Sequence, residues 1–591
     1  MIVKGSKERK IKKFFAKPLP AKLLRHKSLI AIIIFALVVS SWLMLSTLSY
    51  SDGYIEVSGH MWSDFLSHIP LVRSFSEGAN IPPESPLFGG ERIKYHFLFY
   101  LLAGGLEAIG MRIDVAINIL SIVGMVGMLV GIYLLAKKIT KSKGAGWLAV
   151  LLFFFNSSFS WLYYLSSAGL GLTSLNEVIT NSDYAAFGPY DDKLISAFWT
   201  LNVYTNQRHL GLSFGLMFLA VWGIYYSKKR WGMALGVLVF AIMPWLNKAM
   251  LLLMVVTLGL LFLSNRRKRK RVVALSLAGG LLALPGITYL SDVGAVGENG
   301  FRVWWGFLYK ATTWEGVNVP AGILRWIVYW FLNLGLLPIL AIVGLFKVER
   351  FKKIKLKGTY WDGLEQLVRY IITPTTVWFW SAVITFVIAN SFVFATDPAT
   401  NHKLINYVAI IFNIYAAYVI VKLFTRKTFP IAIILLIGLT LGGIFDLFPI
   451  VNNSKALWAD FSTSKTATWL RDNTDPKATI FNLTYEVAPA GTAGRKIYYG
   501  WDYLNWSIGY DVFSRKDILQ KAAQGQYSKE ELCNFLRANN FSYILMNSYT
   551  EKFVEVDVNK RYFEDNFVAP ESYEEDFPVI LYDTDRSCAD V

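Results

Sequence analysis

The chain has little charge and almost no cysteine. Only 17% of its 591 residues are Asp, Glu, Lys or Arg, whereas 54% are hydrophobic and 16% are aromatic. This balance excludes an ordinary soluble protein, in which about a quarter of the residues are charged. The two cysteines, Cys533 and Cys588, both lie near the C-terminus. A disulfide between them is plausible if that region is extracytoplasmic, and two separate free thiols are the alternative.

Signatures of common enzyme classes are missing as well. The sequence contains no metal-ligand spacing of Cys and His, no P-loop, no nucleotide-binding glycine fingerprint and no Gly-x-Ser-x-Gly turn. It also contains no fixed-period repeat and no low-complexity tract. Any chemistry must therefore be inferred from the placement of single polar residues.

The net charge of +17 is unevenly distributed. The segment from Asn452 onward holds 15 Lys and Arg against 21 Asp and Glu, so the preceding residues carry the whole positive excess. That excess sits in short clusters between long apolar runs, as in the cytoplasmic loops of membrane proteins. Nucleic acid is therefore not an expected partner.

Eleven apolar runs have the length of a membrane span, about 20 residues. Basic clusters at 1–27, 137–143, 228–230, 266–271, 347–357 and 422–427 all fall on the N-terminal side of the membrane under this count, which makes that side cytoplasmic. Because the number of spans is odd, the C-terminus lies on the other side. The runs are 28–49, 113–136, 145–163, 205–227, 231–246, 247–264, 272–290, 321–346, 374–395, 404–424 and 429–450.

The sequence thus predicts a polytopic α-helical protein of the cell membrane. A basic cytoplasmic arm, 1–27, precedes a transmembrane domain, 28–450, with a large first outer loop, 50–112. A small extracytoplasmic α+β domain, 451–591, follows. Residues 95–109 are predicted to form an interfacial or re-entrant helix. The C-terminal domain is predicted to contain helices at 463–473 and 528–539 and strands at 542–546 and 578–582.

The first outer loop contains the most informative polar pair. Asp64 and His68 are four residues apart and share one face if the segment is helical. A carboxylate in a partly desolvated cavity can act as a general base toward a hydroxyl, and His68 or His96 can tune it. Glu56 and Tyr95 belong to the same loop and are further candidates for the cavity. A simple helix-surface pair is the alternative.

Three other segments carry positive charge at the same outer level, against the usual bias of membrane proteins. An anionic partner such as a lipid phosphate or pyrophosphate would explain them, and a structural anionic lipid is the alternative. We therefore expect the cationic residues to converge on one phosphate-binding cavity, flanked by the amide residues beside them. The cationic candidates are Arg208, His209, Lys248, His402 and Lys403, and the amides are Gln207, Asn247 and Asn401.

This layout resembles the GT-C superfamily of membrane glycosyltransferases, which use polyprenyl-phosphate-linked sugars. In that superfamily an acidic residue of the first outer loop is the catalytic carboxylate, which corresponds here to Asp64. Two stretches are similar to a bacterial and archaeal branch that has a Tyr-Tyr-Tyr run in this loop, although the chain departs from the run at His96 and Phe97. The first stretch, in the first outer loop, comprises Asp64…His68, Pro82-Pro83…Pro86…Gly89 and Lys94-Tyr95-His96-Phe97. The second, in the C-terminal domain, comprises Gly500-Trp501-Asp502, Trp506, Gly509-Tyr510-Asp511 and Arg515. Residues 500–503 are also faintly similar to the Trp-Trp-Asp-Tyr-Gly motif of oligosaccharyltransferases, without its first Trp and its Gly.

The resemblance implies transfer of a hexosyl or pentosyl group from a polyprenyl-phosphate-linked donor to a glycan, lipid or protein acceptor. It implies no cofactor and leaves a divalent metal open. Trp304, Trp305 and Trp314 are candidates for stacking on sugar rings, and an aromatic interfacial belt explains them equally well. A lipid or glycan transporter or flippase is the main rival, although it would need ionisable residues near the bilayer midplane. A non-catalytic glycan-binding membrane scaffold is the third hypothesis.

Overall fold

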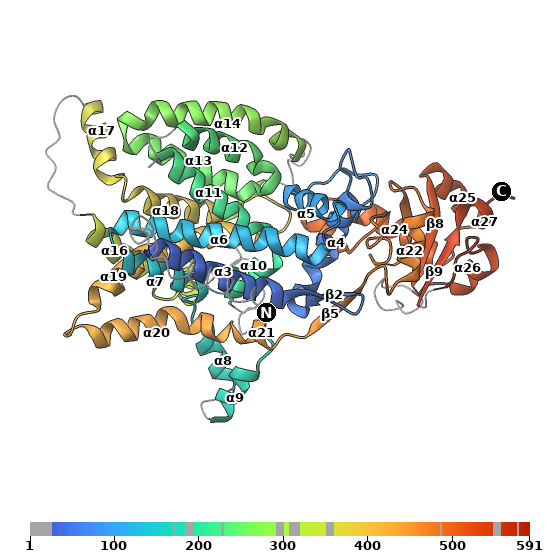
Figure 1. Ribbon diagram of the computed structural model, residues 1–591, viewed down its shortest axis with the longest axis horizontal. Helices are drawn as coiled ribbons and strands as arrows, with labels where there is room; N and C mark the ends of the chain where they lie inside the picture. Colours follow the sequence, from blue (N-terminus) through green and yellow to red (C-terminus); the bar gives the residue numbers. More distant parts are fainter. Residues whose placement is uncertain are drawn as a thin grey trace, which may run out of the picture.

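The computed structural model describes residues 27–168, 172–184, 194–225, 230–290, 301–306, 319–349, 360–484, 487–547, 557–575 and 578–590. A long bundle of helices makes up most of the molecule, and a smaller domain of strands and helices lies at one end of it (Figure 1). Residues 1–26, which are all but the last residue of the basic arm, and Trp314 lie outside the described residues.

Five described helices, with their short flanking turns, are long and apolar enough to cross a membrane. A sixth span results if two helices that meet at a bend of 79° are counted together. The five are α3 (Lys27–Thr47), α6 (Ile113–Thr140), α14 (Arg269–Leu290), α19 (His402–Leu423) and α20 (Phe429–Phe445), and the bent pair is α15 (Val319–Leu334) with α16 (Leu337–Val348). Such helices are those of a polytopic membrane protein, because a helix satisfies all its backbone groups internally.

The other predicted spans correspond to shorter apolar helices, so the count of eleven remains a prediction. These helices are α7 (Lys143–Phe154), α11 (His209–Tyr225), α12 (Arg230–Leu246), α13 (Lys248–Ser264) and α18 (Val377–Ser391). Short connecting or peripheral elements include α8 (Ser160–Ala168), α9 (Leu172–Thr180), η2 (Ser196–Trp199), α10 (Leu201–Asn206), η3 (Arg266–Lys268), α17 (Tyr360–Ile371), η5 (Pro398–Asn401) and α21 (Phe448–Val451). Two short strands, β3 (Arg302–Val303) and β4 (Phe392–Val393), pair with each other.

The predicted span 145–163 is wrong in its second half. Helix α7 ends at Phe154, and the next residues leave the helix and pass the bend between α15 and α16. There the Ser157 hydroxyl donates to the Leu334 carbonyl (2.6 Å) and the Phe159 amide donates to the Leu332 carbonyl (2.8 Å). These bonds satisfy polar groups that the two interrupted helices leave open.

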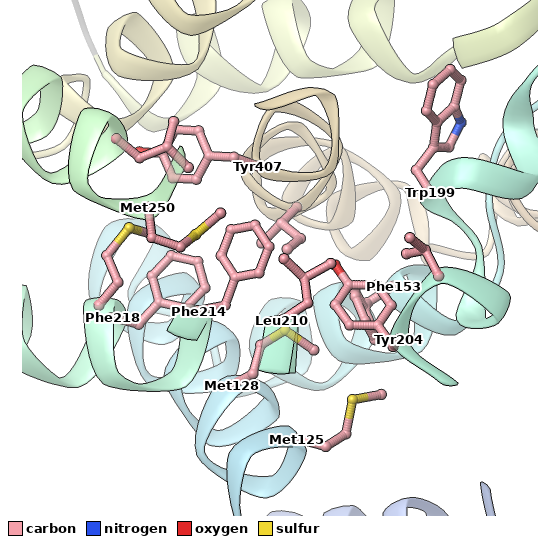
Figure 2. Close-up of a cluster of buried hydrophobic side chains, with 14 of the residues drawn as sticks. Met125, Met128, Phe153, Trp199, Tyr204, Leu210, Phe214, Phe218, Met250 and Tyr407 are labelled. Atoms are coloured by element: carbon pink, nitrogen blue, oxygen red, sulfur yellow. The ribbon is translucent and has the colours of Figure 1, made fainter. Parts of the chain in front are cut away.

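The interior of the bundle is packed with large apolar side chains from helices that are distant in sequence. Figure 2 shows Met128 of α6, Phe214 and Phe218 of α11, Met250 of α13 and Tyr407 of α19 gathered in one cluster. All five are fully or almost fully buried. Close packing of this kind holds the helices in fixed positions and so fixes the residues at their ends.

The first loop connects the bundle to the C-terminal domain. It contains β1 (Leu48–Ser51), β2 (Tyr54–Ser58), η1 (Gly59–Met61), α4 (Trp62–Ser76) and α5 (Leu98–Ala108), and Figure 1 shows α4 and α5 between the two parts of the molecule. Strand β2 pairs with β5 (Lys455–Ala459) from the start of the C-terminal domain. Arg73 of α4 forms buried ion pairs with Glu107 (3.2 Å) and Asp460 (2.8 Å), which tie the three segments together.

The C-terminal domain is built on a four-stranded sheet in the order β7-β6-β8-β9. The strands are β6 (Thr479–Asn482), β7 (Lys496–Ile497), β8 (Phe541–Asn547) and β9 (Val579–Asp583), and the helices are α22 (Lys465–Asn473), α23 (Asp502–Ser507), α24 (Val512–Ala523), α25 (Lys529–Ala538), α26 (Lys560–Asn566) and α27 (Thr584–Ser587). The two predicted helices and two predicted strands are confirmed within a few residues. Two of the three strand pairs are parallel. Helices α23, α24 and α25 lie between β7 and β8, so part of the sheet has the parallel, helix-connected arrangement of α/β folds, whereas β9 is antiparallel.

The predicted link between the two cysteines is present. Cys533 of α25 and Cys588, next to α27, form a disulfide with their Cα atoms 5.7 Å apart. Both residues are fully buried in the core of the C-terminal domain. The bond fastens the end of the chain to the body of that domain.

Candidate functional site

A cavity of about 350 Å³ lies where the helical bundle, the first loop and the C-terminal domain meet. We call it the junction cavity. Its walls come from α4, the loop before α5, the end of α10, the start of α19, and helix α23 with the residues around it. Six of the residues predicted from the sequence line it, namely Asp64, His68, Tyr95, Gln207, His402 and Lys403.

Helix α4 places Asp64 in this cavity because one face of the helix is apolar and packs in the core, whereas another face is polar and lines the cavity. Phe65, Ile69 and Val72 are buried in the core, whereas Asp64 and His68 line the cavity on another face. Both sets follow the spacing of three to four residues that keeps side chains on one side of a helix. The expected pairing of Asp64 with His68 on one helical face is therefore confirmed.

The Asp64 carboxylate is partly exposed to the cavity, and it has no side-chain hydrogen bond or ion pair to any described residue. Burial raises the pKa of Asp64 from 3.8 to about 6, and the charge of Lys403 opposes this rise. The group is therefore mostly ionised at neutral pH but holds a proton more readily than an ordinary carboxylate. This combination suits a general base that must first accept a proton and then release it.

Lys403 is the main cation of the cavity. Its side chain is buried in the first turn of α19, and its Nζ lies 5.6 Å from the centre of the Tyr95 ring. Among the described residues no carboxylate forms an ion pair with it. A buried ammonium that has no carboxylate in ion-pair contact is costly, so an anionic ligand in the cavity would stabilise this arrangement.

Three histidines, His60, His68 and His402, line the cavity. Burial, together with the charges of Arg208 and Lys403, lowers the pKa of His68 to about 3, so its imidazole is neutral. Its Nδ1 is buried and has no hydrogen-bond partner in the described part of the chain. The Gln207 amide nitrogen lies 3.2 Å from His402 Nε2 and can donate to it.

His96 and His209 lie behind the cavity and are not part of its wall. Their Nε2 atoms are 2.8 Å apart, and the Tyr100 hydroxyl lies 3.3 Å from His209 Nδ1. The His96 ring stacks on Tyr95 with the ring centres 3.8 Å apart. We infer that this group supports Tyr95, whose ring in turn faces Lys403.

The predicted convergence of Arg208 and Lys248 on the cavity is wrong. The Arg208 guanidinium turns into the bundle and donates to the Thr205 carbonyl (2.6 Å), Thr47 Oγ1 (2.9 Å) and Asn118 Oδ1 (3.0 Å). Lys248 is exposed outside the cavity, and its ammonium donates to the Leu290 carbonyl (2.6 Å). Both cations therefore donate hydrogen bonds to groups of the protein itself and do not point into the cavity.

Three further candidates have structural contacts and do not line the cavity. Asn247 caps α13 by accepting from the Ala249 amide, and the Asn401 amide donates to the Ala389 and Phe392 carbonyls. Glu56 lies in β2 and accepts a hydrogen bond from Ser49 Oγ (2.7 Å). A sequence cannot show these contacts, because most of the partners come from other turns or elements.

Sequence reasoning missed the contribution of the C-terminal domain to the wall. Trp501, Tyr503 and Asn505 from the α23 region line the cavity, as does Asp397 before α19. The Tyr503 hydroxyl donates to Asp397 Oδ2 (2.9 Å) and so joins the two parts of the molecule at the cavity. The Gly-Trp-Asp stretch was a signal in the sequence, but its position in the same cavity as Asp64 depends on the tertiary structure.

Trp304 and Trp305, two of the proposed sugar-stacking tryptophans, do not line the cavity. Trp305 instead stacks on Trp326 with ring centres 5.6 Å apart. Within the described ranges no group of three His, Cys, Asp or Glu residues is arranged to hold a metal ion.

No protein-family model and no curated protein matches the chain. Among solved structures, it is similar to the crystal structure of ArnT from Cupriavidus metallidurans in the apo state. The match covers 94% of this chain and 97% of that chain, with 10% sequence identity and a TM-score of 0.44.

Proposed function

We propose that this chain is a membrane glycosyltransferase of the GT-C type, which moves a sugar from a polyprenyl-phosphate-linked donor to an acceptor hydroxyl. The observation that carries the proposal is the pairing of two groups in one cavity. Among the described residues, no side chain forms a hydrogen bond or ion pair with the Asp64 carboxylate, and no carboxylate lies in ion-pair contact with the buried Lys403 ammonium. The resemblance of the first loop to GT-C enzymes supports the choice of substrate class.

The two groups match the two charges that such a transfer must handle. The acceptor oxygen attacks the anomeric carbon of the donor and forms the new glycosidic bond, while Asp64 takes the proton from that oxygen. The bond between the anomeric carbon and the phosphate oxygen breaks, and polyprenyl phosphate leaves with the bonding electrons. Lys403 and His402 hold the phosphate, and the ammonium stabilises its growing negative charge. A single displacement of this kind inverts the anomeric configuration.

The same placement argues against a transporter. The charged and amide groups of the cavity gather where the bundle meets the C-terminal domain, whereas a transporter places its substrate site near the middle of its spans. Because the cavity is bounded by the C-terminal domain, we propose that both face the extracytoplasmic side. The basic arm then lies in the cytoplasm.

The test uses the full chain in lipid nanodiscs with radiolabelled polyprenyl-phosphate hexose or pentose and a glycolipid extract of the native membrane. The wild type should release polyprenyl phosphate and move the label into the extract, and Asp64→Asn should do so about 10²- to 10⁴-fold more slowly. If none of the donors is cleaved by the wild type, the proposal fails. Movement of intact donor across a vesicle membrane without cleavage would instead establish the flippase.

A further inference from the structure

Helix α23 closes the junction cavity on the side of the C-terminal domain. Trp501 and Tyr503 line the same cavity as Asp64 and Lys403. The rings of Trp501 and Tyr503 are 5.4 Å apart, and Tyr503 is 38% exposed. Two aromatic rings left partly open beside a catalytic carboxylate form an apolar surface on which a ligand can lie.

This aromatic surface is fixed relative to the phosphate-binding end of the cavity. Tyr503 donates to Asp397, and the other Asp397 oxygen accepts from the Ala399 amide at the start of η5. That short helix leads directly into α19, whose first turn carries Lys403. A ligand on the aromatic surface is thereby held at a set position relative to the donor phosphate.

A second observation comes from the amides of the cavity wall. Asn206, Gln207 and Asn505 each have a buried side-chain oxygen without a hydrogen-bond partner among the described residues. Asn505 is only 1% exposed, and its nitrogen is already engaged with the Leu87 carbonyl (3.1 Å). The Gln207 nitrogen is engaged by His402. The buried atoms that these three amides leave without a partner are therefore all oxygens, which accept hydrogen bonds, and a ligand rich in O–H donors that reaches them would satisfy them.

We propose that Trp501, Tyr503 and these three amides form the acceptor subsite, and that the acceptor is a saccharide. A sugar ring combines an apolar C–H face, which can lie on the aromatic rings, with hydroxyl groups that can donate to the amide oxygens. An acyl chain would leave the amides unsatisfied. This inference rests on the proposed function, because it assigns Asp64 in the same cavity to the hydroxyl of the bound saccharide.

The experiment measures saccharide binding separately from transfer. The full chain in nanodiscs is titrated with a panel of soluble hexose and pentose oligosaccharides, and saturation-transfer NMR reports binding. Trp501→Ala should weaken binding roughly tenfold, the effect of one lost stacking contact, and Trp501→Phe should restore most of it. Phe513→Ala is the matched control, because Phe513 is 74% exposed in the same domain and does not line the cavity.

The outcomes separate this inference from the proposed function. Asp64→Asn should lower transfer by about 10²- to 10⁴-fold and keep most of the oligosaccharide affinity, because the stacking surface and the amides remain in place. Wild-type affinity in Trp501→Ala, or no binding of any oligosaccharide by the wild type, overturns the saccharide subsite even if Asp64→Asn is inactive. Binding of polyprenyl phosphate, measured in every variant, shows that the protein is folded. Undiminished transfer by Asp64→Asn would instead remove the proposed catalytic role and leave the binding result standing.

Discussion

Replacing Asp64 by Asn should lower activity and raise stability at the same time. The amide keeps the shape of the carboxylate but cannot take a proton, so transfer should fall by about 10²- to 10⁴-fold, the usual contribution of a positioned acid–base group. Burial raises the pKa of Asp64 from 3.8 to about 6, which means that the folded protein carries this charge at a cost. Above both pKa values the cost is about 3 kcal/mol.

The sign of this effect fixes its pH dependence. Below pH 3.8 the carboxyl of Asp64 is protonated in both the folded and the unfolded state, so it is neutral like the amide of the Asp64→Asn variant. As the pH rises to about 6, the unfolded chain loses its proton first, and the wild type loses stability that the variant keeps. Thermal unfolding in nanodiscs should therefore give similar unfolding midpoints for the wild type and Asp64→Asn near pH 3.8. Above a pH of about 6, the midpoint of Asp64→Asn should be the higher of the two.

The pH profile of transfer provides the kinetic half of the test. With a pKa of about 6, the ionised fraction of Asp64 is about 0.9 at pH 7 and about 0.1 at pH 5, so the wild-type rate should fall roughly tenfold over this range. The residual rate of Asp64→Asn should lack this step. Glu56→Gln is the matched control and should stay active, because Glu56 faces Ser49 in the sheet. An active Asp64→Asn with an inactive Glu56→Gln would refute the assignment and transfer the role to Glu56.

Three further outcomes are expected. In a binding titration, Lys403→Met should weaken binding of polyprenyl phosphate by about 10- to 100-fold, the effect of losing one charged hydrogen-bond donor. The control Lys248→Met should not weaken it, and equal effects of the two variants would contradict the assignment of Lys403. Arg208→Met should lower the free energy of unfolding by about 1–3 kcal/mol without changing that affinity in the folded protein, and reduced affinity at full stability would restore Arg208 as a phosphate ligand. Reduction of the Cys533–Cys588 disulfide, which closes a separation of 55 residues, should destabilise the C-terminal domain by about 4 kcal/mol, and a thermal midpoint unaffected by reductant would contradict this.

Several elements could be predicted because their cause is local. An apolar run such as 113–136 forms a helix wherever it meets lipid, and the structure has α6 at Ile113–Thr140. The spacing of Asp64 and His68 sufficed to place them on one face of α4. The proline and glycine content of residues 78–92 predicts a turn-rich loop, and these residues form no helix in the structure.

Which polar residues share a cavity was decided by the tertiary structure. Gln207 and Arg208 are neighbours in the turn between α10 and α11, yet Gln207 lines the cavity while Arg208 points into the bundle toward Thr47 and Asn118. No local rule separates them, because the acceptors that draw Arg208 inward come from distant helices. Trp501 likewise shares a cavity with Asp64 because long-range contacts join the C-terminal domain to the first loop, among them the pairing of β5 with β2 and the hydrogen bond from the Gly500 amide to the Leu87 carbonyl (2.8 Å). The sequence by itself thus determined the helices and the candidate groups, whereas long-range packing determined which of those groups meet.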